Sequence, residues 1–352
     1  NQKLFALVQP TMTLGMNGLA LTIYWLGAAL INNIALTDSA ARLTMFSDVL
    51  VFSTYATYVV MSFMMLVMIF MLLPQAQVSA ERINEVLERK ANIREGSVSE
   101  CSEHGTVEFK NVSFRYPHTS EDELSNISFR VNRGETLAVI GATGSGKTTL
   151  VSLIPRFYDV TEGEVLVDGV NVRDYTFDAL YNKLGYVTQK AVLFAGSIRD
   201  NVYFGESEVP ADDEGLAQAV ELSQAKEFVD KLPDGTQHHV AQMGRNMSGG
   251  QKQRLSIARA LARKPEILVF DDSFSALDYR TDAKLREGLS KQLHDKTKII
   301  VAQRISTIRH ADKIIVLDRG EAVGIGTHEE LMRNCDVYRE IATSQLSAAE
   351  LA

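Results

Sequence analysis

A glycine-rich segment with the sequence GATGSGKT runs from Gly141 to Thr148. It matches the phosphate-binding pattern G-x-x-x-x-G-K-[ST] at every defined position. In such a loop the backbone N–H groups turn toward phosphate oxygens, the lysine neutralises the β- and γ-phosphates, and the last hydroxyl ligates Mg²⁺. We therefore expect a nucleoside triphosphate to contact Gly141, Thr143, Gly144, Ser145, Gly146, Lys147, Thr148 and Thr149.

A second chemical signal is the segment EILVFDD, whose apolar run predicts a strand over Ile267–Phe270 that ends at Asp271. A carboxylate at the end of such a strand holds Mg²⁺ in P-loop ATPases, directly or through water. An acidic pair after a strand indicates little by itself, because many strands end in a solvated aspartate. Together with the phosphate loop, it predicts a Mg²⁺ site at Thr148 and Asp271.

The elements that must position these residues belong to two different kinds of polypeptide. The chain has 352 residues, 36 Lys and Arg against 44 Asp and Glu, and a formal net charge of −8. Residues 1–80 contain only four of the charged residues, and the other 76 follow Ala80. This division excludes both a single soluble domain and a wholly membrane-embedded protein. The acidic balance argues against nucleic acid as a partner.

Two long apolar stretches lie in residues 1–80, and each exceeds the about 20 residues that a membrane-spanning helix needs. We expect spans at about 14–36 and 49–73, in a fragment that lacks its beginning. The basic residues Arg82, Arg89, Lys90 and Arg94 place the following part in the cytoplasm. Residues 81–104 are expected to form a connecting helix and linker, and residues 105–345 a nucleotide-binding domain. Five methionines between Met61 and Met71 share one helical face, which suits packing against lipid or helices, or an adaptable substrate path.

The two cysteines, Cys101 and Cys335, are too few and too far apart for a disulfide framework or a zinc site. We expect two unpaired thiols in a reducing compartment.

The segment NMSGGQKQRLSIARAL, Asn246–Leu261, closely resembles the signature of ATP-binding cassette (ABC) proteins, usually LSGGQ, with Met247 in place of leucine. The similarity extends over about residues 105–340, and the segment Leu193–Gly205 resembles the exporter version. The resemblance implies the last two of six spans of an exporter membrane domain, followed by an α/β P-loop nucleotide-binding domain. It also implies ATP and Mg²⁺ as cofactors, a multi-pass protein of the cell membrane with a cytoplasmic cassette, and a second half-transporter as partner.

The resemblance assigns further roles to residues that match the family's motifs. Tyr116 would stack on adenine, and Gln189 would contact Mg²⁺ and the attacking water. The signature residues would reach the γ-phosphate of ATP held by the partner cassette, and Asp278 lies in the loop between the two sites. The signature residues in question are Ser248, Gly249, Gly250 and Gln251.

Two positions depart from the family pattern, and both handle the attacking water. Asp272 stands where the family usually has a glutamate as general base, and Gln303 where it usually has a histidine. The shorter carboxylate retreats by about one carbon–carbon bond, and an amide cannot carry a proton near neutral pH. We therefore expect a degenerate site that holds ATP, hydrolyses it slowly and belongs to a heterodimeric exporter.

Two alternatives remain open at this stage: a homodimeric exporter that uses Asp272 as a slow base, and a membrane-anchored subunit that senses ATP and moves nothing. The transported substrate is not readable from the sequence, so drug-like amphiphiles, lipids and peptides are all open.

Overall fold

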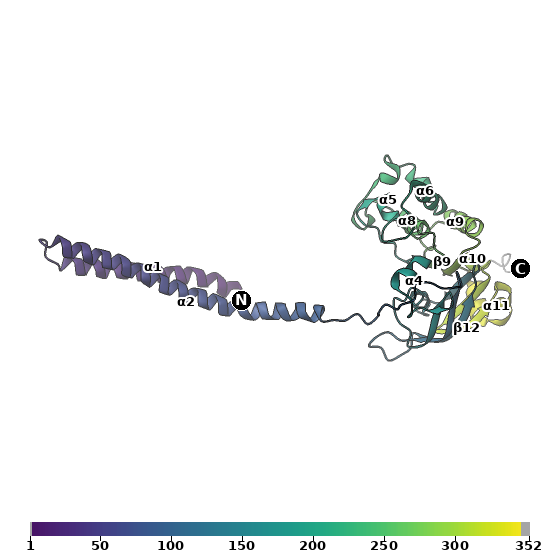
Figure 1. The fold of residues 1–352 in the computed structure, drawn as a ribbon, viewed down its shortest axis with the longest axis horizontal. Coiled ribbons are helices and arrows are strands. Elements are labelled where there is room, and N and C mark those ends of the chain that lie inside the picture. The colour runs from purple at the N-terminus through teal and green to yellow at the C-terminus, as the bar shows by residue number, and fades with distance from the viewer. Residues whose placement is uncertain (1, 346–352) are drawn as a thin grey trace. The chain divides into compact units, whose positions relative to one another are not determined.

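The structure of the chain is a computed structural model that describes residues 2–345. The chain divides into two compact units, with the boundary between Ala91 and Asn92. The first unit consists of two helices and the second is an α/β domain (Figure 1).

The helical unit contains α1 (Gln2–Asn32) and α2 (Ser39–Leu87). The turn between them is closed by two local contacts. Asp38 caps α2 by accepting a hydrogen bond from the Ala41 N–H at 3.1 Å, and the Arg42 guanidinium donates to the Ile34 carbonyl at 2.7 Å. These contacts end α1 at Asn32, four residues before the expected end of the first span.

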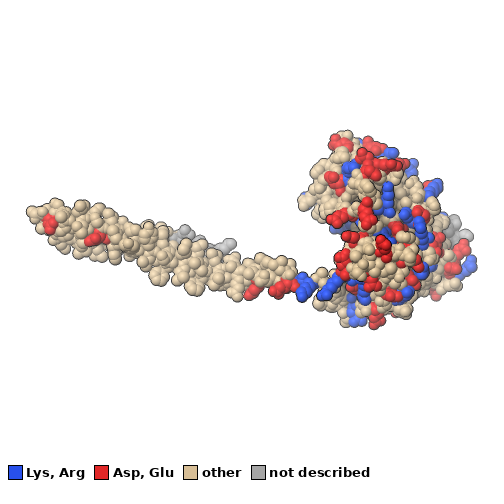
Figure 2. All heavy atoms as spheres, in the orientation of Figure 1, with Lys and Arg blue, Asp and Glu red and all other residues tan. Residues whose placement is uncertain are grey.

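The two helices approach each other closely at Gly27. A Cβ atom at this position would lie 2.6 Å from Cγ1 of Val49, so only glycine allows the contact. Figure 2 shows the surface of this unit as almost free of charged side chains until the end of α2. Pro10–Asn32 and Ser39–Leu87 are long and apolar enough to cross a membrane.

Most large apolar side chains of the helical unit are exposed, and Trp25 is 72% exposed. The methionine face shares this property, since Met61, Met65 and Met68 are all more than half exposed. Such a surface suits lipid or further helices. The second helix continues without a break past Ala80 and ends at Leu87.

The α/β domain is built on a six-stranded sheet and a four-stranded sheet. The six-stranded sheet is parallel except for its edge strand β12, and the four-stranded sheet is antiparallel. In spatial order, the larger sheet contains β12 (Glu321–Gly326), β11 (Lys313–Asp318), β3 (Thr136–Gly141), β10 (Thr297–Val301), β9 (Ile267–Asp271) and β6 (Leu184–Val187). The smaller sheet contains β2 (Leu124–Val131), β1 (Val107–Phe114), β4 (Glu162–Val167) and β5 (Val170–Asn171). A two-stranded ribbon pairs β7 (Gly196–Ser197) with β8 (His239–Val240).

Helices cover the sheets, and the helices α5, α6 and α8 lie together in a lobe of the domain (Figure 1). The α-helices of the domain are α3 (Lys147–Ser152), α4 (Phe177–Lys183), α5 (Ile198–Val202), α6 (Asp213–Leu222), α7 (Lys226–Val229), α8 (Gly249–Ala262), α9 (Tyr279–Gln292), α10 (Ile305–Ile308), α11 (His328–Asn334) and α12 (Asp336–Gln345). Two 3₁₀ turns are η1 (Gly235–Gln237) and η2 (Gln242–Gly244).

The alternation of side chains along the strands gives the six-stranded sheet an apolar core on each face. Leu268 and Phe270 of β9 belong to one core, and Ile267 and Val269 belong to the other. Because the carboxyl ends of parallel strands meet at one edge, the segments that follow β3, β6, β9 and β10 come together there. The sequence of the domain thereby brings its chemically active residues to a single edge.

Candidate nucleotide-binding site

The phosphate loop connects β3 to α3, as its sequence predicts. Gly144 and Gly146 have φ angles of +81° and +92°, which glycine adopts without strain. A Cβ atom at Gly146 would lie 2.7 Å from Cδ2 of Leu124, so the loop also lacks room for a side chain there. These constraints explain why the loop needs glycines to curl around an anion.

Lys147 lies over this loop. Its Nζ donates hydrogen bonds to the carbonyl oxygens of Gly141 at 2.9 Å and Ala142 at 2.6 Å. Burial lowers the pKa of Lys147, while the nearby carboxylates of Asp272 and Asp271 raise it. The ammonium group thus stands at the loop with two acidic side chains close by, where it can also pair with phosphate oxygens.

Thr148 and Asp271 meet at the end of β9. The Thr148 hydroxyl donates to Oδ1 of Asp271 at 2.9 Å, and the Tyr186 hydroxyl donates to Oδ2 at 3.5 Å. Burial raises the pKa of Asp271, the charge on Asp272 raises it further, and the Thr148 hydrogen bond opposes both effects. A hydroxyl and a buried carboxylate at hydrogen-bond distance form the hard oxygen pair that Mg²⁺ prefers, so the residues fit this ion.

Asp272, Gln189 and Gln303 also converge. Oδ2 of Asp272 accepts hydrogen bonds from Nε2 of Gln303 at 2.7 Å and from Nε2 of Gln189 at 3.1 Å. The three residues come from the segments that follow β9, β6 and β10. Asp272 is only 6% exposed, so the two amides supply the partners that a buried carboxylate requires.

A cavity of about 180 Å³ joins these groups, which are the phosphate loop, Gln189, Asp272 and Gln303. The phosphate-loop residues that line it are Thr143, Gly144, Gly146, Lys147, Thr148 and Thr149. The structure therefore brings the expected phosphate-binding and water-handling residues to one place. Gly141 and Ser145 are not among the described residues that line the cavity, and they lie close together, since a Cβ atom at Gly141 would be 2.6 Å from the Ser145 hydroxyl oxygen.

Tyr116 is linked to the loop through Thr149. Its hydroxyl lies 3.0 Å from Oγ1 of Thr149, and its ring packs edge-on against Phe114 and Tyr158. This position holds the tyrosine beside α3. Stacking on adenine stays a prediction.

The signature residues form the start of α8. They are not among the described residues that line this cavity. Ser248 and Gln251 form a capping box: the Ser248 hydroxyl accepts from the Gln251 N–H at 3.3 Å, and the Gln251 side chain accepts from the Ser248 N–H at 2.8 Å. Gly249 and Gly250 form the first turn, where open backbone N–H groups suit an anion.

Asp278 has a similar capping role in α9. It accepts hydrogen bonds from the Thr281 hydroxyl at 2.7 Å and the Thr281 N–H at 3.0 Å. These hydrogen bonds lower the pKa of Asp278. Like the signature residues, it is not among the residues found to line the cavity.

One contact of the site was not foreseen from the sequence. Gln345, in the last turn of α12, accepts a hydrogen bond from the Ile305 N–H at 2.9 Å and donates one to the Gln303 carbonyl at 2.8 Å. Both ends of its amide thus hold the segment that carries Gln303. A lone glutamine forty-two residues after Gln303 carries no sequence signal for this role.

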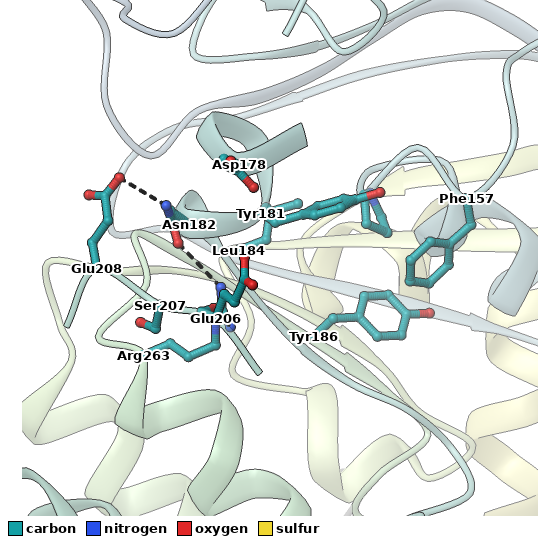
Figure 3. Close-up of a pocket in the computed structure, with 11 residues that line it drawn as sticks. Phe157, Asp178, Tyr181, Asn182, Leu184, Tyr186, Glu206, Ser207, Glu208 and Arg263 are labelled. Atoms are coloured by element: carbon teal, nitrogen blue, oxygen red, sulfur yellow. Dashed lines mark hydrogen bonds between the residues drawn. The ribbon is translucent and has the colours of Figure 1, made fainter. Parts of the chain in front are cut away.

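A larger groove of about 720 Å³ lies beside the site and is lined by residues of α4, β6 and the segment after α5. Figure 3 shows Asn182 between Glu208 and Arg263. The Asn182 amide donates a hydrogen bond to Oε1 of Glu208 at 3.0 Å, and its Oδ1 accepts one from Arg263 at 3.3 Å. At its other end the rings of Phe157 and Tyr186 pack edge to face, 5.4 Å apart. Tyr186 belongs both to this groove and to the Asp271 hydrogen-bond network.

Known proteins share this fold and these motifs. A family model described as ABC transporter matches residues 124–275. An uncharacterised ABC transporter ATP-binding protein of Mycobacterium tuberculosis is 42% identical over 348 residues, which cover 98% of this chain and 58% of that protein. The chain belongs to the ABC transporter family. The family resemblance read from the signature segment is thereby confirmed.

Other ABC proteins similar to this chain include exporters. A putative multidrug export ATP-binding/permease protein of Bacillus subtilis is 44% identical over 241 residues, covering 68% of this chain and 41% of that protein. A solved structure of a bacterial Atm1-family ABC exporter with ATP bound matches 96% of this chain and 59% of its own, at 30% identity and a TM-score of 0.76. The expected fold class, apolar helices followed by an ABC nucleotide-binding domain, is confirmed. The chain spans 58% or less of the length of the two sequence relatives.

Proposed function

We propose that this chain forms part of an ABC exporter that couples ATP binding and hydrolysis to substrate export across the cell membrane. The observation that carries the proposal is the meeting of Lys147, Thr148 and Asp272 at one cavity, with Asp271 hydrogen-bonded to Thr148. Lys147 would hold the β- and γ-phosphates, and Thr148 and Asp271 would hold Mg²⁺ with help from Gln189. The bound Mg²⁺ would neutralise charge on the phosphates.

We infer that this ATP site is degenerate. Asp272 carries a shorter carboxylate than the glutamate usual in the family, and the amides of Gln189 and Gln303 both hold its Oδ2. General-base assistance is worth about 10²- to 10⁴-fold in rate, and an aspartate held away from the water forfeits most of it. ATP would therefore stay bound for long at this site.

A second half-transporter would complete the transporter. The signature segment Ser248–Gln251 is not found among the residues that line the cavity, which fits its use against ATP on a partner cassette. A partner with glutamate and histidine at the two altered positions would hydrolyse ATP with the help of this chain's signature. The assembly would then be a heterodimer with one slow and one fast site.

The groove beside Tyr186 provides a second way to influence the site. Tyr186 lines the groove and hydrogen-bonds to Asp271, and β6 leads directly to Gln189. A loop that shifts the Tyr186 ring would thereby move a Mg²⁺ ligand.

The helical unit would lie in the lipid bilayer as part of a multi-pass membrane domain, with the ABC domain in the cytoplasm. Its two apolar helices and the basic residues after them support this orientation. The exposed methionine face of α2 suits an adaptable contact with apolar substrates.

The test is nucleotide binding and turnover by the purified full chain in lipid nanodiscs. We expect Mg²⁺-dependent ATP binding with slow hydrolysis, and loss of binding in Lys147→Ala. Fast turnover by the chain alone would favour the homodimer and contradict the degenerate site. ATP binding without export, after reconstitution with a second half-transporter, would favour the regulatory subunit.

A further inference from the structure

A second cluster of metal-ligating side chains lies where the linker leads into β1. Cys101, His104 and Asp168 place one ligand atom each within 4.8 Å of one another. Cys101 and His104 belong to the segment before β1, and Asp168 lies in the turn between β4 and β5. We propose that these three side chains bind a Zn²⁺ ion that fastens the linker to the nucleotide-binding domain.

The geometry of the cluster suits a zinc ligand set. Sγ of Cys101 lies 3.7 Å from Oδ2 of Asp168, close to the about 3.4–3.8 Å between neighbouring ligands that tetrahedral zinc bond lengths imply. All three ligand atoms lie within 4.8 Å of one another, and the His104 side chain is 51% exposed, so it has room to adjust its position. Thiolate, imidazole and carboxylate together select zinc over harder cations such as Mg²⁺ or Ca²⁺.

Glu266 orients the histidine. Its Oε1 lies 3.1 Å from Nδ1 of His104, which leaves the other ring nitrogen for the metal. A carboxylate that holds the second nitrogen of a ligating histidine is the usual arrangement around protein-bound zinc. Oε2 of Glu266 is buried and accepts no hydrogen bond in the described structure, and its nearest cation is the Lys183 ammonium at 3.6 Å.

The charges around the cluster favour a divalent cation. The Asp168 side chain is fully buried, and Lys183 Nζ lies 2.8 Å from its Oδ2 and 3.6 Å from Oε2 of Glu266. A bound Zn²⁺ ion would displace the Cys101 proton, and the two carboxylates and the resulting thiolate would then exceed the one ammonium by the two negative charges that Zn²⁺ neutralises.

The backbone already holds the ligands in place. Oδ1 of Asp168 accepts a hydrogen bond from the Thr106 N–H at 2.8 Å, which ties the turn after β4 to the linker. Asp168 has a φ of +52°, an uncommon conformation for a residue other than glycine. The cysteine spacing predicted no zinc site, because two of the three ligands are not cysteines and Asp168 is distant in sequence.

The experiment titrates the purified full chain, freed of metal by chelation, with Zn²⁺ and with Co²⁺ as a coloured substitute. Excess Mg²⁺ and the absence of nucleotide keep both ions from the Thr148–Asp271 pair. We expect one equivalent to bind, with the charge-transfer absorption of a cobalt–thiolate bond. Zinc would also raise the thermal unfolding temperature of the domain.

Variants assign the signal to this cluster. Cys101→Ser should abolish the cobalt–thiolate band, His104→Ala should weaken binding at least tenfold, and Glu266→Gln about 10- to 100-fold. The matched controls Cys335→Ser, at the other thiol, and His310→Ala should bind as the wild type does. Asp168→Asn would also disturb the hydrogen bond that Oδ1 accepts from the Thr106 N–H, so its effect would not report on the metal alone.

Two results would overturn the proposal. One is a wild-type chain that binds neither ion more tightly than Cys101→Ser does. The other is a thiolate band that survives in Cys101→Ser and disappears in Cys335→Ser. Because no step uses ATP, these results are independent of the proposed transport function.

Discussion

The ATP site has a phosphate-holding half, which contains Lys147, Thr148 and Asp271, and a water-handling half, which contains Asp272, Gln189 and Gln303. The two halves differ in how their polar groups are arranged. Lys147, Thr148 and Asp271 have family-typical residue types, and their hydrogen bonds leave the cavity lined with groups for phosphate and Mg²⁺. Asp272, by contrast, is held by the amides of Gln189 and Gln303. The difference teaches that affinity for a nucleotide and the ability to cleave it can change independently within one site.

Restoring the water-handling half has the largest expected effect. The double variant Asp272→Glu with Gln303→His lengthens the carboxylate and supplies an imidazole, so hydrolysis at this site should rise by about 10²-fold or more. The measurement is phosphate release under single-turnover conditions. Gln292→His, at the exposed end of α9, is the matched control. An unchanged rate in the double variant would show that these two residues do not limit hydrolysis.

Breaking the phosphate-holding half has the next largest effect. Lys147→Ala removes the ammonium from the loop, and a hydrogen bond to a charged group is worth enough to weaken ATP binding about 10- to 100-fold. Fluorescent-nucleotide titration measures the change in dissociation constant. Lys284→Ala, on the exposed face of α9, should leave binding unaltered; equal affinity in Lys147→Ala would mean that the loop does not hold phosphate.

A smaller effect is expected at the metal pair. Asp271→Asn removes the negative charge opposite the Thr148 hydroxyl, so about tenfold more Mg²⁺ should be needed for half-maximal ATP binding. The titration is done at fixed ATP concentration, with Asp234→Asn on the surface as the control. A Mg²⁺ requirement that does not move would remove Asp271 from the metal site.

The smallest effect is expected at the contact between α12 and the Gln303 segment. Gln345→Ala removes two hydrogen bonds, each with a modest net free energy, so the release rate of ATP should change about two- to fivefold. Stopped-flow displacement of bound nucleotide measures this rate. Gln345→Glu keeps the acceptor for Ile305 and loses the donor for Gln303, and should therefore show an intermediate rate.

Local patterns predicted the elements that carry the active residues, whereas the α/β fold of the domain was expected from the resemblance of its motifs to ABC proteins. The phosphate loop, the strand that ends at Asp271 and the helix that begins after Ser248 all follow from short segments whose residue types determine their backbone. The apolar composition also predicted two membrane-type helices. It did not predict where the first helix ends, because Asp38 and Arg42 close the turn at Asn32 through specific hydrogen bonds.

Local sequence patterns could not predict the contacts between distant segments. Tyr186 reaches Asp271 because β6 and β9 are neighbours in the sheet, and Gln345 reaches Gln303 because α12 packs against α10. The meeting of His104 with Glu266 likewise depends on the tertiary contact of the linker with the residue that precedes β9. Side-chain chemistry was readable from the sequence, but the choice of partner required the tertiary structure.

The most direct test follows the fate of ATP bound to this chain's own site. Radiolabelled ATP is bound to the wild type, to Asp272→Asn and to the Asp272→Glu, Gln303→His variant, and the ratio of ATP to ADP is measured over time. The account predicts intact ATP in the first two proteins and ADP in the third. Rapid conversion to ADP by the wild type, prevented by Asp272→Asn, would show that Asp272 is a working base and would contradict the account.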